Sequence, residues 1–324
     1  MAASGRVVVV GSFNVDHAWH CDALPRAGET LAGRYASGPG GKGFNQAIAA
    51  RRAGADTIFV CALGNDAGGA LALELAATEG IGLRTHASRE PTGTAGIFVD
   101  ANGRNCIVIG PGANATLDSG ALAAAEADVR AADVLLAQME TPPATVLTAL
   151  RTARANATRT ILNPAPADAD VGAALLALAD VLTPNETEFA ALCTRHLHAS
   201  PDADGLATLP DAELHALCRR LLPHGTVVVT LGAHGCFVSH TDDESCGDAH
   251  DACRLPAERV EAVDTTGAGD AFNGALAAAL AASGTGRFEA HVRFASRYAA
   301  LSVERPGAAL AMPRRQEVFD RYGG

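Results

Sequence analysis

The sequence predicts an α/β protein built on a doubly wound, mostly parallel sheet. Short apolar runs rich in β-branched residues recur along the chain, and the first of them, residues 7–10, ends at Gly11. Such runs are typical of strands that are buried on both faces of a parallel sheet. Segments rich in Ala and Leu with helical spacing separate these runs. Strands that alternate with helices in this way favour parallel pairing.

The elements of this sheet follow one another along the whole chain. Strands are expected at residues 7–10, 57–62, 134–137, 160–162, 181–182 and 227–231. Helices are expected at residues 45–53, 69–79, 143–156, 212–222 and 271–282. In such sheets ligands bind at the carboxyl ends of the strands, so polar residues that directly follow a strand are the first candidates for a site.

Two segments, 16–37 and 92–109, break the alternation with turn-forming residues. Asn102-Gly103 lies between two apolar runs, which is a hairpin signal. We therefore expect a single domain over residues 1–324 with a small sheet inserted from these two segments. That sheet could serve as a lid or as the contact of a homodimer. Two polar stretches, 196–210 and 240–251, are expected to be surface loops without a chemical role.

Composition excludes several classes of function. Lys and Arg number 25 against 36 Asp and Glu, so the net charge is −11 and nucleic acid is an unfavourable partner. Phosphate binding must then come from local backbone amides and a metal ion. The eight cysteines form no CxxC pair, which predicts free thiols in a reducing compartment. The apolar runs are too short for a membrane span, so a cytoplasmic protein without a membrane partner is expected.

The segment 264–272, with the sequence DTTGAGDAF, leads from small residues into an expected helix. Backbone amides around Gly267 and Gly269 can converge on an anion at the helix N-terminus. Asp270 could then accept a proton from a substrate hydroxyl beside that anion. An Asp that caps a helix after a Gly-rich turn is equally common. The segment alone leaves both interpretations open.

The segment 37–46, with the sequence SGPGGKGFNQ, also runs into a helix. It fails the Walker phosphate motif, because Ala36 and Gly43 stand where Gly and Ser or Thr are needed. Its glycines match GxGxxG, but no strand of the first βαβ unit precedes them and no acidic residue stands at the distance that NAD requires. We therefore favour a backbone wall in which Lys42 and Asn45 donate to a polyhydroxylated ligand.

Asn14 and Asp16 come directly after the first expected strand. Side chains two residues apart in an extended chain point to the same side, which suits two adjacent sugar hydroxyls. Ordinary turn formation explains the same pair equally well.

Taken together, these motifs resemble a known family. Segments 40–45 and 264–270 are similar to the two sequence patterns of the PfkB carbohydrate kinases, and the likeness extends in one register from about residue 7 to about residue 313. Further segments resemble the ribokinase branch of that family, namely 24–30, 163–166, 183–188 and 230–235. The resemblance implies an ATP-dependent kinase that phosphorylates the 5-hydroxyl of D-ribose.

The resemblance also implies a role for individual residues. Asp270 would be the catalytic base, and the amides of Gly267, Ala268, Gly269 and Asp270 would form the anion hole. The sugar pocket would consist of Asn14, Asp16, Gly41, Lys42, Asn45, Glu140 and Asp270. Asn185 and Glu188 would help to place Mg²⁺ and the phosphates of ATP. The nucleotide would also contact Thr230, Gly232, Gly235 and Gly269.

Members of the ribokinase branch are activated by a monovalent cation such as K⁺, which is held largely by backbone carbonyls. The matching positions here are Asp264, Thr266, Ser302, Arg305 and Gly307. Ala311 stands where the branch usually has a Ser, and a methyl group cannot coordinate a cation. We therefore expect weaker or altered activation by K⁺.

Three alternatives to a ribose kinase stay open. The first is a family member that acts on another pentose, a ketose or a nucleoside, because Phe13, Trp19, His20 and Phe44 near the expected pocket are bulkier than or different from the ribokinase pattern. The second is a non-catalytic sugar-binding regulator. The third and most remote is a dehydrogenase that uses the GxGxxG match.

Overall fold

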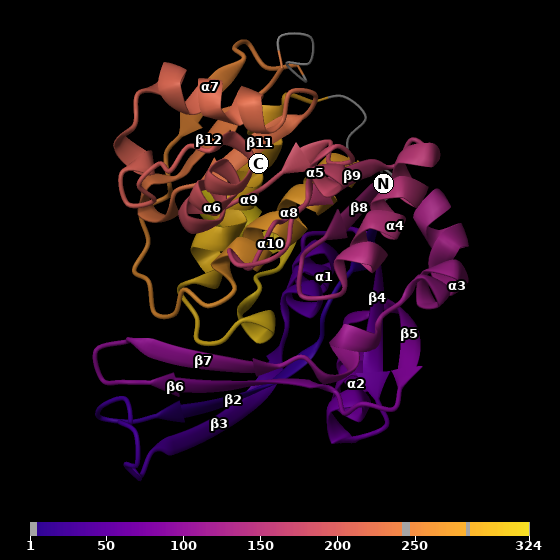
Figure 1. Ribbon diagram of the computed structural model, residues 1–324, viewed down its shortest axis with the longest axis vertical. Helices are drawn as coiled ribbons and strands as arrows, with labels where there is room; N and C mark the ends of the chain where they lie inside the picture. Colours follow the sequence, from indigo (N-terminus) through magenta and orange to yellow (C-terminus); the bar gives the residue numbers. More distant parts are fainter. Residues whose placement is uncertain (1–4, 242–246, 283–285, 324) are drawn as a thin grey trace.

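The predicted fold class is confirmed by the computed structural model, which describes residues 5–241, 247–282 and 286–323 (Figure 1). A nine-stranded sheet forms the centre, with a separate four-stranded sheet beside it. In spatial order the large sheet contains β13 (Ala252–Leu255), β12 (Cys236–Ser239), β11 (Thr226–Thr230), β10 (Val181–Leu182), β9 (Arg159–Leu162), β8 (Val134–Ala137), β1 (Arg6–Val10), β4 (Asp56–Gly64) and β5 (Gly82–Ser88). The antiparallel pairs of this sheet, β11 with β12 and β12 with β13, lie at one edge.

The order of the strands reverses next to β1. From β1 the chain adds β4 and β5 on one side, and it then returns to place β8, β9, β10 and β11 on the other side. The segments that leave β1 and β8 therefore diverge at the carboxyl edge of the sheet. An open α/β sheet forms its ligand crevice at such a switch point.

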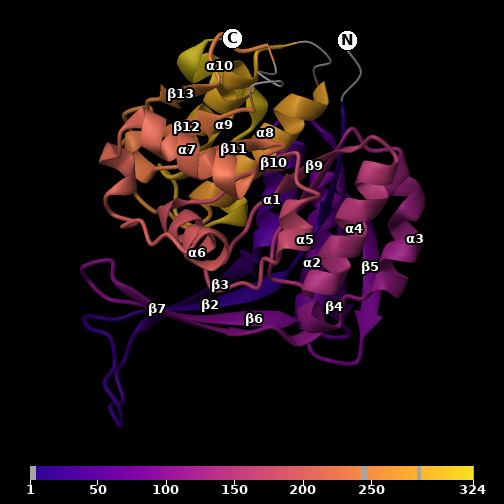
Figure 2. The same cartoon turned by 45° about the horizontal axis from the view of Figure 1, so that its top comes forward.

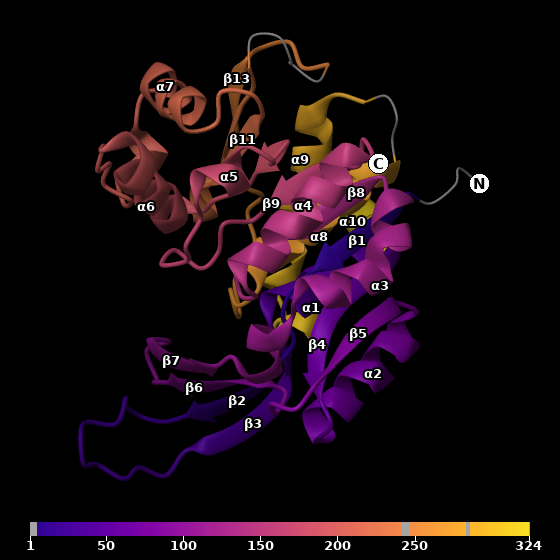
Figure 3. The ribbon, with the colours of Figure 1, turned by 45° about the vertical axis from the view of Figure 1, so that its right-hand side comes forward.

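Helices cover both faces of the large sheet. One face packs against α1 (Lys42–Arg52), α2 (Ala67–Glu79), α8 (Ala268–Ala282), α9 (Phe288–Ser302) and α10 (Arg315–Tyr322). The other packs against α3 (Ser119–Arg130), α4 (Pro143–Ala155), α5 (Ala173–Leu176), α6 (Glu186–Leu197) and α7 (Asp211–Leu221), and Figure 3 shows α3 and α4 side by side. Val7 and Val9 of β1 belong to the first core, and Val8 and Val10 belong to the second. No described helix is both long and apolar enough to cross a bilayer.

The small sheet projects from the helical body (Figure 2). Its order is β3 (Arg34–Gly40), β2 (Asn14–His20), β6 (Gly93–Val99) and β7 (Asn105–Gly110). β6 and β7 form the predicted antiparallel hairpin. Its loop is fixed by Asp100 Oδ1, which accepts the amides of Asn102 and Arg104 at 2.9 Å, and by Gly103, whose φ is +77°. The two predicted segments thus supply this sheet, although β2 begins at Asn14.

The two polar stretches are not the plain surface loops that we predicted. In the first, α6 extends to Leu197, and Leu206 is buried in the second core. In the second, His240 and Asp248 are buried, with 3.1 Å between Nε2 and Oδ2. Asp248 also accepts the amide of Glu289 at 2.9 Å, which anchors the first turn of α9. Residues 242–246, which include Cys246, lie outside the described part of the chain.

Candidate active site at the carboxyl edge of the sheet

A cavity of about 150 Å³ lies where the strands β9, β10 and β11 end and α8 begins. It unites one predicted sugar-binding residue, several predicted nucleotide residues and the predicted base. Its lining consists of Lys42, Asn163, Ala165, Thr183, Asn185, Glu188, Thr230, Thr265, Gly267, Ala268, Gly269, Asp270 and Asn273. These residues come from distant parts of the sequence, so the fold assembles the site at the edge that the topology indicates.

Asp270 lies in the first turn of α8, which begins at Ala268 and so starts three residues before the predicted boundary. The turn before it contains Gly267 with a φ of +76°, a conformation that favours glycine. The carboxylate of Asp270 does not cap its own helix. Its Oδ2 accepts from Asn45 Nδ2 and its Oδ1 from Gln46 Nε2, both at 2.9 Å. These contacts decide against the capping interpretation.

The backbone around this turn retains part of the predicted anion hole. The amide of Ala268 donates to the carbonyl of Thr265 at 3.2 Å, so it is already engaged. The amides of Gly269 and Asp270 belong to the first helical turn and therefore have no acceptor within their own helix. The positive end of the helix dipole adds to these donors. An anion hole at this turn would therefore depend on the other three predicted amides, those of Gly267, Gly269 and Asp270.

Opposite charges meet around Lys42, at the start of α1. Burial raises the pKa of Asp270, although Lys42 and the two side-chain amides favour its charged form. Burial acts to lower the pKa of Lys42, but the charges of Asp270, Glu140 and Glu188 outweigh burial and raise it. Lys42 is therefore protonated at neutral pH.

The segments after β1 and β8 supply the acidic side of the site. Glu140 Oε2 accepts from Ser12 Oγ at 2.5 Å and from the amide of Lys42 at 3.0 Å. Asn14 Oδ1 accepts from Asn114 Nδ2 at 2.8 Å. Burial, together with the charges of Glu140 and Asp270, raises the pKa of Asp16 to about 6. Among the predicted sugar-binding residues, the charges of Asp16, Glu140, Lys42 and Asp270 therefore lie close enough to act on one another.

The glycines before α1 allow the backbone to lie close to Asn14 and Asp16. Gly41 has a φ of +85°, and a Cβ there would lie 2.8 Å from the amide nitrogen of Asn14. A Cβ on Gly40 would lie 2.1 Å from Asp16 Oδ2. These residues thus form a tight backbone wall against Asn14 and Asp16. Because Gly38 and Gly40 belong to β3 of the small sheet, the GxGxxG match does not lie in a βαβ unit.

Asn185 and Glu188, which were predicted to place Mg²⁺ and phosphates, form the capping box of α6. Asn185 Oδ1 accepts the amide of Glu188 at 2.8 Å, and Glu188 Oε2 accepts the amide of Asn185 at 2.9 Å. Both residues also line the cavity, together with Thr230. Burial raises the pKa of Glu188, although the Asn185 amide and Lys42 oppose the rise. The metal role remains a prediction.

Gly232 and Gly235, the other predicted nucleotide residues, do not line the cavity. Gly232 is the first residue of the short 3₁₀ helix η3 (Gly232–His234), which follows β11, and Gly235 directly follows that helix. Gly235 has a φ of +90°, and a Cβ there would lie 2.0 Å from the carbonyl oxygen of Leu255. The close packing of residue 235 against β13 therefore explains why a glycine is needed at this position.

The predicted cation-binding residues lie on two loops that Asp264 joins. Its Oδ1 accepts the amide of Thr266 and its Oδ2 accepts the amide of Gly307, both at 2.9 Å. Burial alone would raise the pKa of Asp264, but the hydrogen bonds from Thr266 and Gly307 lower it, so the carboxylate is ionised. An ionised carboxylate beside turn carbonyls fits a monovalent cation electrostatically.

The remaining members of the predicted cation set are Ser302, the last residue of α9, and Arg305, which follows that helix. Ser302 Oγ donates to the carbonyl of Ala299 at 2.8 Å, and the Arg305 guanidinium pairs with Glu317. Ala311 is buried in η4 (Ala309–Ala311). It therefore offers only a methyl group in this region.

Two of the aromatic residues expected near the pocket lie elsewhere. Phe13 and Phe44 are fully buried and pack edge to face with their ring centroids 5.0 Å apart, so they belong to the core. Trp19 lies on the face of the small sheet opposite to Asp16, as the odd-numbered residues of β2 do. Only His20 shares the face of Asp16, and it is exposed.

Sequence reasoning missed several polar residues of the site. Gln46 contacts Asp270 directly, while Asn163, Thr183 and Asn273 line the cavity. Asn163 and Thr183 stand directly after β9 and β10. The rule that ligands bind after strands could have found these two residues.

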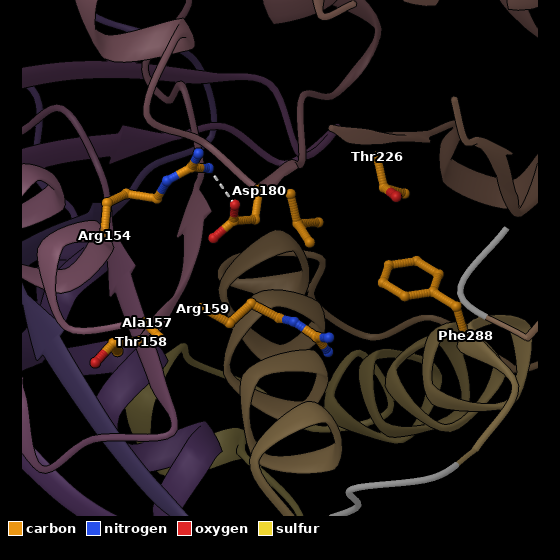
Figure 4. Close-up of a pocket in the computed structure, with 8 residues that line it drawn as sticks. Arg154, Ala157, Thr158, Arg159, Asp180, Thr226 and Phe288 are labelled. Atoms are coloured by element: carbon orange, nitrogen blue, oxygen red, sulfur yellow. Dashed lines mark hydrogen bonds and ion pairs between the residues drawn. The ribbon is translucent and has the colours of Figure 1, made fainter. Parts of the chain in front are cut away.

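A larger cavity, of about 360 Å³, lies at the amino ends of β9, β10 and β11 (Figure 4). Arg154 reaches Asp180 there, and Arg159 extends toward Phe288. None of the predicted site residues lines it. The smaller cavity is the candidate active site because it contains Asp270, Lys42 and Glu188 at the carboxyl edge.

Comparisons with known proteins identify the family of the chain. The profile of the pfkB family carbohydrate kinases matches residues 4–315. The chain is 37% identical to the ribokinase of Haemophilus influenzae, and the alignment covers 97% of each chain. It is 37% identical to the ribokinase of Mus musculus, over 96% of this chain and 93% of the relative. It is 31% identical to the deoxyribokinase of Salmonella typhi, over 98% of each chain.

Two solved structures show the same fold over nearly the whole chain. The ribokinase of Giardia lamblia superimposes with a TM-score of 0.86 at 30% identity and 98% coverage of both chains. The ribokinase of Arabidopsis thaliana, solved in complex with ribose and ATP, gives a TM-score of 0.81 at 29% identity and the same coverage. With the family profile matching almost the full length and relatives above 30% identity, the chain belongs to the pfkB family of carbohydrate kinases.

Proposed function

We propose that this carbohydrate kinase transfers the γ-phosphate of ATP to the 5-hydroxyl of D-ribose. The observation that carries the proposal is the buried carboxylate of Asp270, held by two side-chain amides at the start of α8 and next to Lys42. The names of the relatives, and the Arabidopsis protein bound to ribose and ATP, support the substrates.

In this proposal Asp270 accepts the proton of the 5-hydroxyl as the sugar oxygen attacks the γ-phosphorus. The bond between that phosphorus and the bridging oxygen breaks, and ADP leaves with the electron pair. The amides of Gly269 and Asp270 stabilise the charge that develops on the transferred phosphoryl group. Asn14, Asp16, Gly41, Lys42, Asn45 and Glu140 hold the other parts of the sugar.

The charge of the site supports a divalent cation with the nucleotide. The charges of Asp270, Glu140 and Glu188 act on Lys42, and those of Glu140 and Asp270 act on Asp16. This acidic group would repel a free triphosphate. Mg²⁺ would neutralise the phosphates, and the carboxylate of Glu188 with the amide of Asn185 fits the oxygen-rich outer environment that Mg²⁺ and its waters prefer. Thr230, Gly232, Gly235 and Gly269 would contact the nucleotide.

The first test is a screen for ADP release over ribose, deoxyribose, fructose and nucleosides, with the wild type and Asp270→Asn. Ribose should give the highest kcat/KM, and Asp270→Asn should lower kcat by about 10² or more because the shape remains and the base is lost. A preference for deoxyribose would instead favour the activity named for the Salmonella relative. Absence of ADP release with every sugar would favour a sugar-binding regulator.

The second test concerns Asp16. Its pKa of about 6 means that the carboxylate becomes neutral, and loses its strength as an acceptor, as the pH falls below 6. The Kd for ribose, measured by calorimetry without nucleotide, should rise about tenfold between pH 7 and pH 5. Asp16→Asn should bind weakly at both pH values. A wild-type Kd that does not change over this range would contradict the assignment.

The third test concerns K⁺, which we propose to bind near Asp264, Thr266, Ser302, Arg305 and Gly307. Because Ala311 offers no oxygen, the rate should increase only weakly when K⁺ replaces a large organic cation. The variant Ala311→Ser supplies a hydroxyl and should respond more strongly. Strong activation of the wild type at low K⁺ would be the contrary result.

We further propose that the small sheet acts as a lid over the sugar and as the contact of a homodimer in the cytoplasm. By strand register, Ile107 and Ile109 share the face of Asp16, which supports a lid. All residues of the edge strand β7 are exposed, with Ile107 at 50%, Val108 at 66% and Ile109 at 46%. An exposed apolar edge strand is a template for pairing, and a second copy of this sheet offers a matching edge.

The fourth test measures mass in solution by light scattering. Val108→Lys should convert the dimer into a monomer because it places a charge on the exposed edge strand. Leu73→Lys, on α2, is the matched control, since Leu73 is 54% exposed outside the small sheet, and it should remain dimeric. A monomeric wild type at micromolar concentration would exclude this dimer.

A further inference from the structure

Gln46 lies next to Asn45 in the first half of α1, and its side chain is fully buried. Its Nε2 donates to Asp270 Oδ1 at 2.9 Å and to Asn163 Oδ1 at 3.1 Å. Its Oε1 accepts from Gln138 Nε2 at 2.6 Å. Every polar atom of this side chain is thus used by the protein itself, and none remains for a substrate.

Asn45 differs from Gln46 in this respect. Its Nδ2 also donates to Asp270, but its buried Oδ1 has no hydrogen-bond partner among the described residues. A buried acceptor without a partner is costly unless a ligand supplies the donor. Asn45 therefore fits a residue that contacts the sugar, as predicted. Gln46 fits a residue that acts on Asp270 alone.

Gln138 fixes which end of the Gln46 amide faces Asp270. A carboxamide can rotate by half a turn and exchange its oxygen and nitrogen, and an oxygen placed against the carboxylate would be repelled. The donor from Gln138 holds Gln46 Oε1, so Nε2 is directed to Asp270. Gln138 is itself fully buried against Gly11, where an added Cβ would lie 2.0 Å from Gln138 Oε1.

The same hydrogen-bond path returns to the turn that contains the predicted anion hole. Asn163 Nδ2 donates to the carbonyl of Thr183 at 3.0 Å, and Thr183 Oγ1 donates to Asn273 Oδ1 at 2.5 Å. Asn273 Nδ2 then donates to the carbonyl of Gly269 at 2.8 Å. Residues after β8, β9 and β10 thereby set the base and its adjacent amides relative to each other.

We propose that Gln46 is a positioning residue that holds the carboxylate of Asp270 in the orientation and ionisation state needed to accept the hydroxyl proton. The inference rests on the proposed role of Asp270 as the base. Donors on both oxygens prevent rotation of the carboxylate, and a hydrogen bond from Gln46 favours its charged form. Burial raises the pKa of Asp270, and the hydrogen bond from Gln46 acts to lower it.

The direction of the pH effect follows from this arrangement. The base must be ionised, so kcat falls as the pH drops through the pKa of Asp270. Burial raises that pKa, and loss of the Gln46 hydrogen bond would raise it further. Removal of this donor should therefore move the acid limb of the kcat profile to higher pH.

The variant Gln46→Met keeps the approximate length of the side chain and removes its donors. We expect kcat to fall about 10- to 100-fold, the acid limb to move up by about one pH unit, and the Kd for ribose to change less than about threefold. Gln138→Met leaves Gln46 in place but frees its amide, so it should produce a smaller shift in the same direction.

Thr160→Val is the matched control for the loss of a buried hydrogen bond. Thr160 is fully buried in β9, and its hydroxyl contacts Asp180 and the carbonyl of Leu178, away from the candidate site. This variant should lower the melting temperature and retain the wild-type kcat and pH profile.

The outcomes separate this inference from the proposed function. If Asp270→Asn retains kcat, the base assignment is wrong. If Asp270→Asn is inactive while Gln46→Met keeps the wild-type acid limb, only the positioning role is overturned. Should Gln46→Met not fold, Gln138→Met provides the test, and an unchanged kcat and acid limb in that variant overturn the inference.

Discussion

The close approach of α1 and α8 is the constraint on which the rest of the site depends. A Cβ on Gly274 of α8 would lie 2.4 Å from the carbonyl oxygen of Gln46 and 2.5 Å from Ala49 Cβ. The same approach places Gln46 against Asp270, although 224 residues separate them in sequence. Larger side chains at this contact would force the helices apart, and such overpacking typically costs about 1–3 kcal/mol. The low aromatic content, 4%, fits a core that needs small residues at such contacts.

Burial disfavours the charged forms of the ionisable groups at the site, whereas hydrogen bonds and attraction between opposite charges favour them. Burial raises the pKa values of Asp16, Glu188 and Asp270 and acts to lower the pKa of Lys42. Isolated charges in such surroundings would lose their ionisation. Attraction to Lys42 favours the charged forms of Asp270 and Glu188, and the amide donors of Asn45 and Gln46 do the same for Asp270. Contacts within the fold thus also act on the ionisation of the residues for which we propose a role in the reaction.

The sequence predicted the sheet because runs such as residues 7–10 are buried on both faces, which leaves a strong local signal. It could not decide whether Asp270 is a base or a cap, since both follow a Gly-rich turn. Only the contacts of Asp270 with Asn45 and Gln46 of α1 argue against the cap. Phe13 was misjudged because its neighbour Asn14 is a predicted sugar-binding residue, and the direction of a side chain depends on packing. Gln46 was missed because its role depends on Gln138, 92 residues away.

The two sheets meet at a hydrogen-bonded junction, which bears on how the predicted sugar-binding residues lie relative to Asp270. The chain passes from β1 into β2 through Phe13, whose amide and carbonyl both bond the side chain of Asn114 at 3.0 Å. Asn114 lies in η1 (Gly112–Thr116), directly after β7, so one side chain joins the start and the end of the small sheet. Because Asp16 lies in β2, a closing movement of this sheet as one body would carry Asp16 with it. Asp270, fixed by α1 in the main body, would be the stationary partner of such a movement.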